Sequence, residues 1–356
     1  MTGADRIWAD LLVDGFYFLS LALAGLVFLA IQYVAGAGWW SAIRRVPEAL
    51  MTLVPLAAVP MLALYFGRGT LYPWTRSELL HDPVVAGKSA YLNTPFFFAR
   101  MLLFLALWSG FAMVLRRASL AQDRDDDLRH HRRMVRASAG FLVVFAVSFS
   151  LASFDWLMSL DPRWSSTIFA VYTFAGLLLE GIAAITLCVV LLRERDPLAE
   201  VVNESHLHDL GKLLFAFSTF WAYIWVSQYL LIWYTNLAEE IPYYIERTRG
   251  GWLALFVLNP VLNWVVPFVV LLPRAAKRNP AVLKWTAAVV LVGSWLGLYL
   301  VVAPEVLDGP RLGLLELLLA AGYAGLFVFL AARALTSAPL IARNDPFLVE
   351  SLHHHQ

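Results

Sequence analysis

Nine long apolar stretches dominate this sequence and limit the folds that it can adopt. Each has about 20 residues or more, the length that an α-helix needs to cross a hydrocarbon core of ~30 Å. Because that core offers no water to unpaired backbone groups, such stretches cross it as helices. The predicted spans are 11–35, 46–66, 95–115, 134–154, 165–192, 210–236, 252–272, 282–302 and 312–335. The sequence therefore predicts an all-α, polytopic membrane protein, in keeping with 60% hydrophobic and 15% charged residues.

The basic residues predict how the chain is oriented. Of its 27 lysines and arginines, 18 lie in the loops after the odd-numbered spans and in the C-terminal segment, which leaves 27 − 18 = 9 for the other side. Cytoplasmic loops carry such an excess. We expect the N-terminus in the periplasm, the tail 336–356 in the cytoplasm, and the loops 67–94, 154–164 and 238–251 in the periplasm. The net charge of +1 gives no reason to expect a nucleic-acid partner.

Histidine and cysteine usage restricts the cofactors that this chain can hold. None of the eight histidines lies within a predicted span, whereas a membrane cytochrome b needs axial ligands there. Cys188 is the only cysteine, so no cysteine-ligated iron-sulfur or zinc site is expected from this chain alone. Phosphate-loop, dinucleotide and metalloprotease motifs are also missing. We expect no metal and no cofactor of its own, with haem and iron-sulfur clusters left to partner chains.

The span 210–236 is unusually aromatic and polar. Helical periodicity places Ser218, Trp221, Trp225, Gln228 and Thr235 on one face, which we expect to point into a helix bundle. The alternative is a belt of aromatic residues at the membrane interface. Glu239, Glu240 and a proline follow the span and predict a polar cap at one membrane surface.

A single acidic residue, Glu180, falls near the middle of a predicted span. Tyr172, Gly176 and Glu180 share one helix face, and the glycine lets a neighbouring helix come close. Two interpretations stay open: a structural hydrogen bond between helices, or a step in a proton path that leaves through Asp155, Glu239 and Glu240.

Three other polar positions carry structural expectations. Arg100 should pair with Asp155, Glu239 or Glu240, or extend to the membrane surface. Asp161, followed by Pro162, is expected to cap the N-terminus of the next helix. Asn259-Pro260, Asn263 and Pro267 predict a kinked helix with free carbonyl groups, which often line cavities.

Seven blocks of sequence carry a family resemblance: AGAGWWSAIRRVPEAL, TLYPW, GKSAYLNTPFFFAR, FDWLMSLDPRWSSTIFAVYTFAG, HDLGKLLFAFSTFWAYIWVSQYLLIWYTNLAEE, PRAAKRNP and DPFLVESLHHHQ. Together they resemble the ActF-type membrane subunit of bacterial alternative complex III, a quinol:cytochrome c (or other high-potential acceptor) oxidoreductase of respiratory electron transport. That subunit belongs to the NrfD/polysulfide-reductase membrane-anchor family. The resemblance covers nearly the whole chain, although the family has ten spans and this sequence shows nine.

The resemblance implies one integral membrane domain, 1–356, with four-helix bundles at 11–156 and 165–302, a peripheral helix at 312–335 and the tail. It implies the bacterial cytoplasmic membrane as location. The partners that it implies are a homologous NrfD-like membrane subunit, an iron-sulfur subunit, multihaem and monohaem cytochrome c subunits, a terminal oxidase and membrane lipids. Its motif blocks cover Asp155, Asp161, Gln228, Glu239 and Glu240. Glu180 lies outside the segments that are most typical of the family.

Three functions from different classes fit these observations. The first is a cofactor-free subunit that supports assembly and contributes contacts to quinone, menaquinone or lipid, or proton translocation. The second is a quinol-oxidising subunit with a quinone site of its own. The third is a secondary transporter, which should show internal repeats. The sequence has no motif repeated between its halves, so this third function is the weakest.

Overall fold

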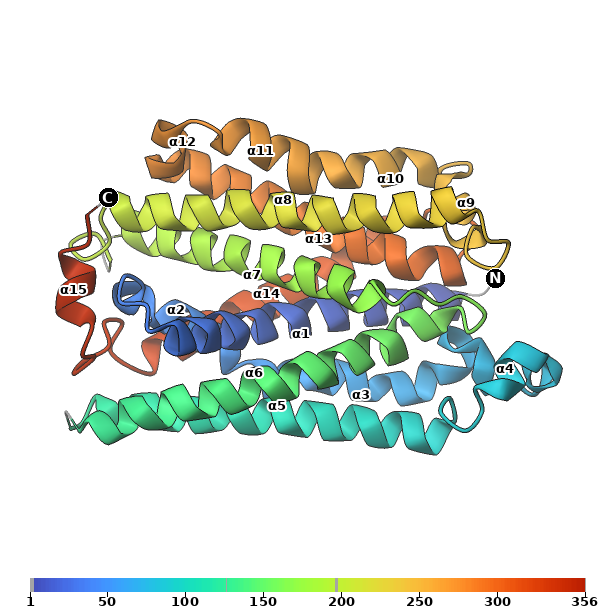
Figure 1. Ribbon diagram of the computed structural model, residues 1–356, viewed down its shortest axis with the longest axis horizontal. Coiled ribbons are helices and arrows are strands. Elements are labelled where there is room, and N and C mark those ends of the chain that lie inside the picture. The colour runs from blue at the N-terminus through green and yellow to red at the C-terminus, as the bar shows by residue number, and fades with distance from the viewer. Residues whose placement is uncertain (1–2, 126, 196–197, 356) are drawn as a thin grey trace.

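A computed structural model describes residues 3–125, 127–195 and 198–355, and every regular element in these ranges is helical (Figure 1). Nine helical segments of the described chain are long and apolar enough to cross a membrane. The predicted class, an all-α polytopic membrane protein, is confirmed. The long helices are α1 (Gly3–Ala35), α3 (Val54–Leu71), α5 (Thr94–Gln122), α6 (Leu128–Trp156), α7 (Phe169–Glu194), α8 (Glu204–Thr235), α13 (Pro280–Val306) and α14 (Leu314–Thr336). The seventh span consists of α10 (Trp252–Pro260), η5 (Val261–Val265) and α11 (Val266–Leu271).

Short helices lie at the two ends of the long ones. They are α2 (Arg45–Met51), α4 (Pro83–Gly87), α9 (Pro242–Thr248), α12 (Arg274–Arg278) and α15 (Leu348–Leu352), with 3₁₀ turns η1 (Ser41–Ile43), η2 (Pro73–Thr75), η3 (Ser77–His81) and η4 (Met158–Leu160). The N-terminus, α4 and α9 lie at one end of the molecule, and α12, α15 and the C-terminus lie at the other (Figure 1). These are called the N-terminal end and the C-terminal end below.

Polar caps fix where several long helices begin. The side chain of Asn93 accepts a hydrogen bond from the backbone of Phe96 at the start of α5, and Asn279 does the same for Ala281 and Val282 in α13. A proline follows each cap in the first turn, where its missing N–H costs nothing. These local signals place the helix starts within a few residues of the predicted span boundaries.

Helix α1 is the central element of the packing. It packs against α3 and α6 in the first half of the chain and against α7 and α13 in the second half. In the most apolar part of α1, 78% of the residues are buried, compared with 11% for α14, which packs on α1 and α2 from outside. The group α1, α3, α5 and α6 and the group α7, α8, α10–α11 and α13 therefore meet along α1.

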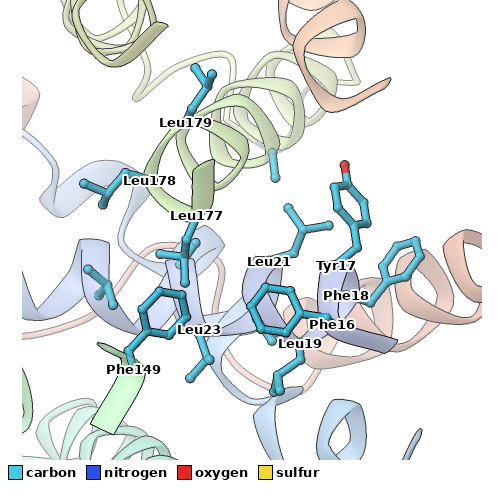
Figure 2. Close-up of a cluster of buried hydrophobic side chains, with 14 of the residues drawn as sticks. Phe16, Tyr17, Phe18, Leu19, Leu21, Leu23, Phe149, Leu177, Leu178 and Leu179 are labelled. Carbon is cyan, nitrogen blue, oxygen red and sulfur yellow. The ribbon is translucent and has the colours of Figure 1, made fainter. Parts of the chain in front are cut away.

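Close van der Waals packing holds these helices together, because lipid tails are as apolar as the side chains themselves. Phe16 of α1, Phe149 of α6 and Leu177 of α7 form one cluster of buried side chains (Figure 2). Gly181 of α7 lies so close to Ala24 of α1 that a methyl group at position 181 would overlap with it. The small residues thus allow the two halves of the chain to touch.

The seventh span is kinked, as its asparagines and prolines predict. The π-helical turn η5 separates α10 from α11. Asn259 donates a hydrogen bond of 2.9 Å from Nδ2 to the carbonyl of Gly293 in α13. Only glycine fits at 293, because a Cβ there would lie 2.6 Å from Oδ1 of Asn263. The kink therefore brings two buried asparagines against a glycine-lined face of α13.

A buried charge network closes the C-terminal end. Glu48 accepts hydrogen bonds from Arg44, Arg45 and Arg116, and Arg44 also reaches Asp345 of the tail at 2.5 Å. The predicted tail is thus packed against the bundle. In α15, Ser351 donates to the carbonyl of Trp39 at 2.6 Å. Because each buried carboxylate has arginine partners, the cost of removing these charges from water is offset.

The predicted orientation can be tested with two exposed positions at opposite ends. In a Cys188→Ala background, Ser77→Cys and Arg124→Cys each introduce one exposed thiol, at the N-terminal and C-terminal end respectively. An impermeant thiol reagent added to intact cells from the periplasmic side should label position 77 and leave position 124 unlabelled until the membrane is opened. The reverse pattern would invert the orientation, and labelling of both positions in sealed cells would contradict a membrane crossing by α5.

Candidate functional site

A small polar cavity lies where the two halves of the chain meet. Its volume is about 50 Å³. One water molecule needs roughly 10–15 Å³ by this measure, so there is room for about three to five. The lining comes from α1, α7, α8, η5, α13 and the residue that follows α6, with the residues Phe16, Ser20, Leu157, Tyr172, Thr173, Gly176, Leu177, Glu180, Trp221, Asn263, Ser294, Gly297, Leu298 and Val301.

Glu180 is the only acidic residue in this lining. It is 5% exposed and is the twelfth residue of the 26-residue helix α7, close to the middle of the span. Tyr172 and Gly176 line the same cavity, in agreement with their predicted common face. No lysine, arginine or histidine is among the lining residues, so the carboxyl has no basic neighbour within the cavity.

The hydroxyl of Ser20 is the contact between Glu180 and α1. Ser20 Oγ forms a hydrogen bond with Oε1 of Glu180 and lies 3.0 Å from the carbonyl oxygen of Tyr17. A serine hydroxyl has one proton to donate but two lone pairs to accept with. When that proton points to Tyr17, a protonated Glu180 can donate to Ser20. When Glu180 is ionised, the serine can turn and donate to it. The pair therefore accommodates both protonation states.

Asn263 supplies a second polar group to the cavity. Its Oδ1 accepts a hydrogen bond from Ser294 at 3.3 Å, while its buried Nδ2 has no hydrogen-bond partner among the described protein groups. Buried amide groups are normally paired with protein or water. The cavity therefore has both the volume to hold water and a free N–H donor that can bind it. The proline and asparagine pattern of the kink was the sequence signal for this position.

Arg100 and Asp155 form a buried ion pair away from this cavity. Nε of Arg100 lies 2.7 Å from Oδ2 of Asp155, and Nη2 lies 3.0 Å from Oδ1. The guanidinium also lies 3.8 Å from the ring centre of Tyr91 and 4.2 Å from that of Phe96. Of the three partners predicted for Arg100, the structure selects Asp155. Both carboxylate oxygens of Asp155 are bound by the arginine, and Asp155 is not part of the cavity lining.

Glu239 and Glu240 lie in the connection after α8, at the N-terminal end. Glu239 is exposed and borders a surface hollow of about 540 Å³, together with Asp161, Glu246 and Glu305. Partial burial and the negative charge of Glu305 raise the pKa of Glu246 above its usual range. The hollow is acidic, but it is separate from the cavity around Glu180.

The expectation that Asp161 caps the next helix is wrong. Helix α7 begins at Phe169, and Ile168 precedes it without a side-chain cap. Asp161 instead accepts a hydrogen bond of 2.9 Å from the backbone N–H of Arg163. Arg163 pairs with Asp82 across the surface at 2.8 Å. The sequence DPRW after Leu160 therefore forms a turn that the neighbouring loop holds in place, and not the first turn of a helix.

Arg247 lies between the acidic hollow and the cavity. Its guanidinium donates to Glu305 at 2.7 Å and to the carbonyl of Val301 at 2.9 Å, and Val301 lines the cavity. The ring centre of Tyr243 is 3.4 Å from the guanidinium carbon. The sequence suggested only a polar cap here. A buried arginine that is paired with Glu305 therefore lies between the cavity and the acidic hollow.

Gln228 lies on the buried face of α8, as its predicted face requires, but outside the cavity lining. It is 2% exposed, and its Nε2 has no hydrogen-bond partner among the described protein groups. Trp221, two turns away on the same face, does line the cavity. Thr235 is exposed, so the face turns toward solvent or lipid near the helix end.

Two acidic residues of α1 were overlooked in the sequence. Asp10 and Asp14 are 3% and 1% exposed, and Nε1 of Trp295 donates a hydrogen bond of 2.8 Å to Asp14. Helix α1 begins at Gly3 rather than at residue 11, so Asp10 lies inside it as well as Asp14, which the predicted span 11–35 already contained. The signal was available as two aspartates four residues apart, one helical turn, at the start of an apolar run.

Four histidines fall inside long helices, which corrects one sequence expectation: His130 and His131 lie in the first turn of α6, and the other two lie in α8. His206 and His208 belong to the first turns of α8, where the backbone N–H of His206 completes the Asn203 cap. They lie at the C-terminal end and do not face each other across the middle of the bundle. Among the described residues, no cluster of three or more histidine, cysteine or acidic side chains could hold a metal ion.

An apolar groove of about 410 Å³ runs along the outside of α1, between α3 and α14. Its lining is Gly15, Phe18, Leu53, Leu56, Ala57, Val59, Pro60, Tyr323, Leu326, Phe327 and Leu330. Apart from the hydroxyl of Tyr323, no polar side-chain group lines it. Such a surface suits an apolar chain from the bilayer.

Comparison with known proteins adds no family. No protein-family model matches the chain, and no curated protein matches it.

The Arg100–Asp155 pair is predicted to stabilise the fold. Asp155→Asn removes one charge and leaves a buried guanidinium uncompensated, so the free energy of unfolding should fall by about 3–5 kcal/mol. Thermal unfolding in detergent measures this loss. Glu239→Gln is the matched control, because it neutralises an exposed carboxyl at the same end and should leave stability unchanged. A fully stable Asp155→Asn protein would show that the pair contributes little.

Proposed function

We propose that this chain is an integral membrane subunit of a bacterial respiratory quinol:cytochrome c (or other high-potential acceptor) oxidoreductase, and that it takes part in proton translocation. The observation that carries the proton part is Glu180, a buried carboxyl near the middle of a span, next to a polar cavity with room for water. Buried ionisable groups at this depth are costly and are commonly functional. The respiratory assignment draws on the sequence blocks that resemble the ActF-type subunit.

In this proposal the chain moves protons while partner chains move electrons. The haem and iron-sulfur groups belong to cytochrome c subunits and an iron-sulfur subunit, beside a homologous NrfD-like membrane subunit. Glu180 accepts a proton from water in the cavity and releases it again, and Ser20 supplies a hydrogen bond in both states. Tyr172, near the start of α7 at the N-terminal end, supplies another hydroxyl to the same cavity.

The proposed setting is the bacterial cytoplasmic membrane, with the N-terminal end in the periplasm. The excess of basic residues in the loops of the C-terminal end supports this orientation. The acidic hollow around Glu239 and Glu246 then faces the periplasm.

Glu180→Gln tests the proton function directly. Glutamine keeps the shape and can still hydrogen-bond to Ser20, but it has no titratable proton. In the assembled complex in proteoliposomes, we expect normal assembly and a proton-transfer step slowed on the order of 100-fold, as is common when a positioned proton-transferring group is lost. Proton release per quinol oxidised is measured against Glu239→Gln. Unchanged turnover and unchanged proton release would instead identify Glu180 as a structural contact between helices.

The apolar groove favours a second candidate function, a quinone contact in this chain. Its lining accepts an isoprenoid tail, and the Tyr323 hydroxyl can donate to a quinone oxygen. Ala57→Trp should fill the groove and reduce the quinone that co-purifies with the chain. Val143→Trp is the control, because residue 143 is 70% exposed on α6, away from the groove. A wild-type chain without quinone, or equal quinone in both variants, would exclude this site and leave the groove to lipid.

A further inference from the structure

A line of polar side chains runs along α1 from the N-terminal end to the cavity. Asp10, Asp14, Tyr17 and Ser20 follow one another at spacings of four, three and three residues. Side chains at these spacings are neighbours on one side of a helix, with Cβ atoms about 5–6 Å apart. All four are buried within the protein, at 5% exposure or less. These polar side chains therefore face other parts of the protein and not lipid.

The surface end of this line is an ion pair. Arg6 is partly exposed and bonds to Glu316 of α14 at 2.6 Å, and Oε2 of Glu316 accepts the backbone N–H of Gly313 at 2.8 Å. The carboxyl of Asp10 interacts electrostatically with Arg6, Glu316 and Asp14. Its Oδ2 is buried and has no hydrogen-bond partner among the described protein groups. An unpaired buried carboxylate oxygen beside other carboxyls is a place for a proton or a water molecule.

The middle of the line is Asp14 and Tyr17. Asp14 accepts a hydrogen bond of 2.8 Å from Trp295, which fixes its position without neutralising it. The Tyr17 hydroxyl donates to the carbonyl of Leu291 at 2.9 Å, and it interacts electrostatically with both Asp14 and Glu180. Ser20 then contacts Glu180. Asp10, Asp14 and Tyr17 are thus linked by electrostatic interactions, and Ser20 connects this line to Glu180 by a hydrogen bond.

We propose that protons pass between Glu180 and the N-terminal surface along α1, through Ser20, Tyr17, Asp14 and Asp10 to the Arg6–Glu316 pair. This inference rests on the proposed function, in which Glu180 exchanges protons. Each transfer moves one proton from an oxygen to the next oxygen or to a bridging water, so that one O–H bond breaks and one forms. Each carboxyl takes a proton on one side and releases one on the other, and no oxidant is needed.

The route expected from the sequence, through Asp155 and Glu239, is less suitable. Both oxygens of Asp155 are bound to Arg100, and neither Asp155 nor Glu239 lines the cavity. The buried guanidinium of Arg247, which is paired with Glu305, lies between the cavity and the acidic hollow, and it cannot relay a proton because arginine stays protonated in proteins. Along α1 the only basic side chain of the line is Arg6, at the surface end.

Hydrogen–deuterium exchange of the Glu180 carboxyl tests the route. The full chain, reconstituted in liposomes, is transferred to D₂O, and the carbonyl stretching band of the protonated carboxyl is followed by infrared spectroscopy. Glu180→Gln identifies the band by removing it. We expect Asp14→Asn and Asp10→Asn to slow its exchange on the order of 100-fold, whereas Asp308→Asn, an exposed aspartate at the same end, leaves the rate unchanged.

Two further measurements separate the explanations. Asp14→Glu restores a carboxyl and should restore fast exchange. If Asp14 has a purely structural role, its variants should change the melting temperature, and the exchange rate should not depend on whether position 14 carries a carboxyl. If the band is present and Asp14→Asn exchanges at the wild-type rate, the route along α1 is overturned and the proposed function stands. If no band depends on Glu180, both the proposed proton function and the route fail.

Discussion

The packing of α1 between the two halves of the chain is the contact on which the rest of the structure depends. A helix in contact with lipid cannot carry aspartates, because a lone carboxyl in hydrocarbon costs several kcal/mol. Helix α1 carries Asp10 and Asp14 because α3, α6, α7, α13 and α14 surround it. The close contact of Gly181 with Ala24 brings α7 near enough for Glu180 to reach Ser20. The cavity exists because two independent groups of helices meet there and leave a small polar gap.

Buried charges in this protein fall into two kinds. Arg44 with Glu48, Arg100 with Asp155 and Arg247 with Glu305 are ion pairs with short, well-directed hydrogen bonds, and they lie toward the ends of the helices. Removing one partner would leave the other charge uncompensated, so these pairs belong to the architecture. Glu180 and Asp14 are different, since each is held by a neutral donor, Ser20 or Trp295. A carboxyl held in this way keeps the freedom to gain or lose a proton, which a guanidinium partner would suppress.

The kinked seventh span contributes to the same site from the other side. Its π-helical turn places Asn259 against the backbone of α13 and Asn263 in the cavity wall. The polar wall is possible because glycines at 293 and 297 leave room for amide groups that would otherwise overlap with a Cβ. Proton transfer needs water or hydroxyl groups within hydrogen-bonding reach, and the asparagine and serine groups here are suited to holding water.

The sequence by itself determined the features that depend on short stretches of chain. Apolar length defined the nine spans, periodicity placed Tyr172, Gly176 and Glu180 on one face, and Asn-Pro and nearby prolines predicted the kink. Only the tertiary structure decided which groups meet. Ser20 and Glu180 are 160 positions apart, and Arg100 could have paired with any of three acids until the helices packed. Asp161 was predicted to cap a helix because Asp-Pro is a local cap signal. In the structure it contacts Arg163, which pairs with Asp82, and these contacts hold the segment as a turn. A hydropathy profile cannot predict that Asp14 is buried or that it is kept away from lipid. Both depend on neighbouring helices that come from the far end of the chain.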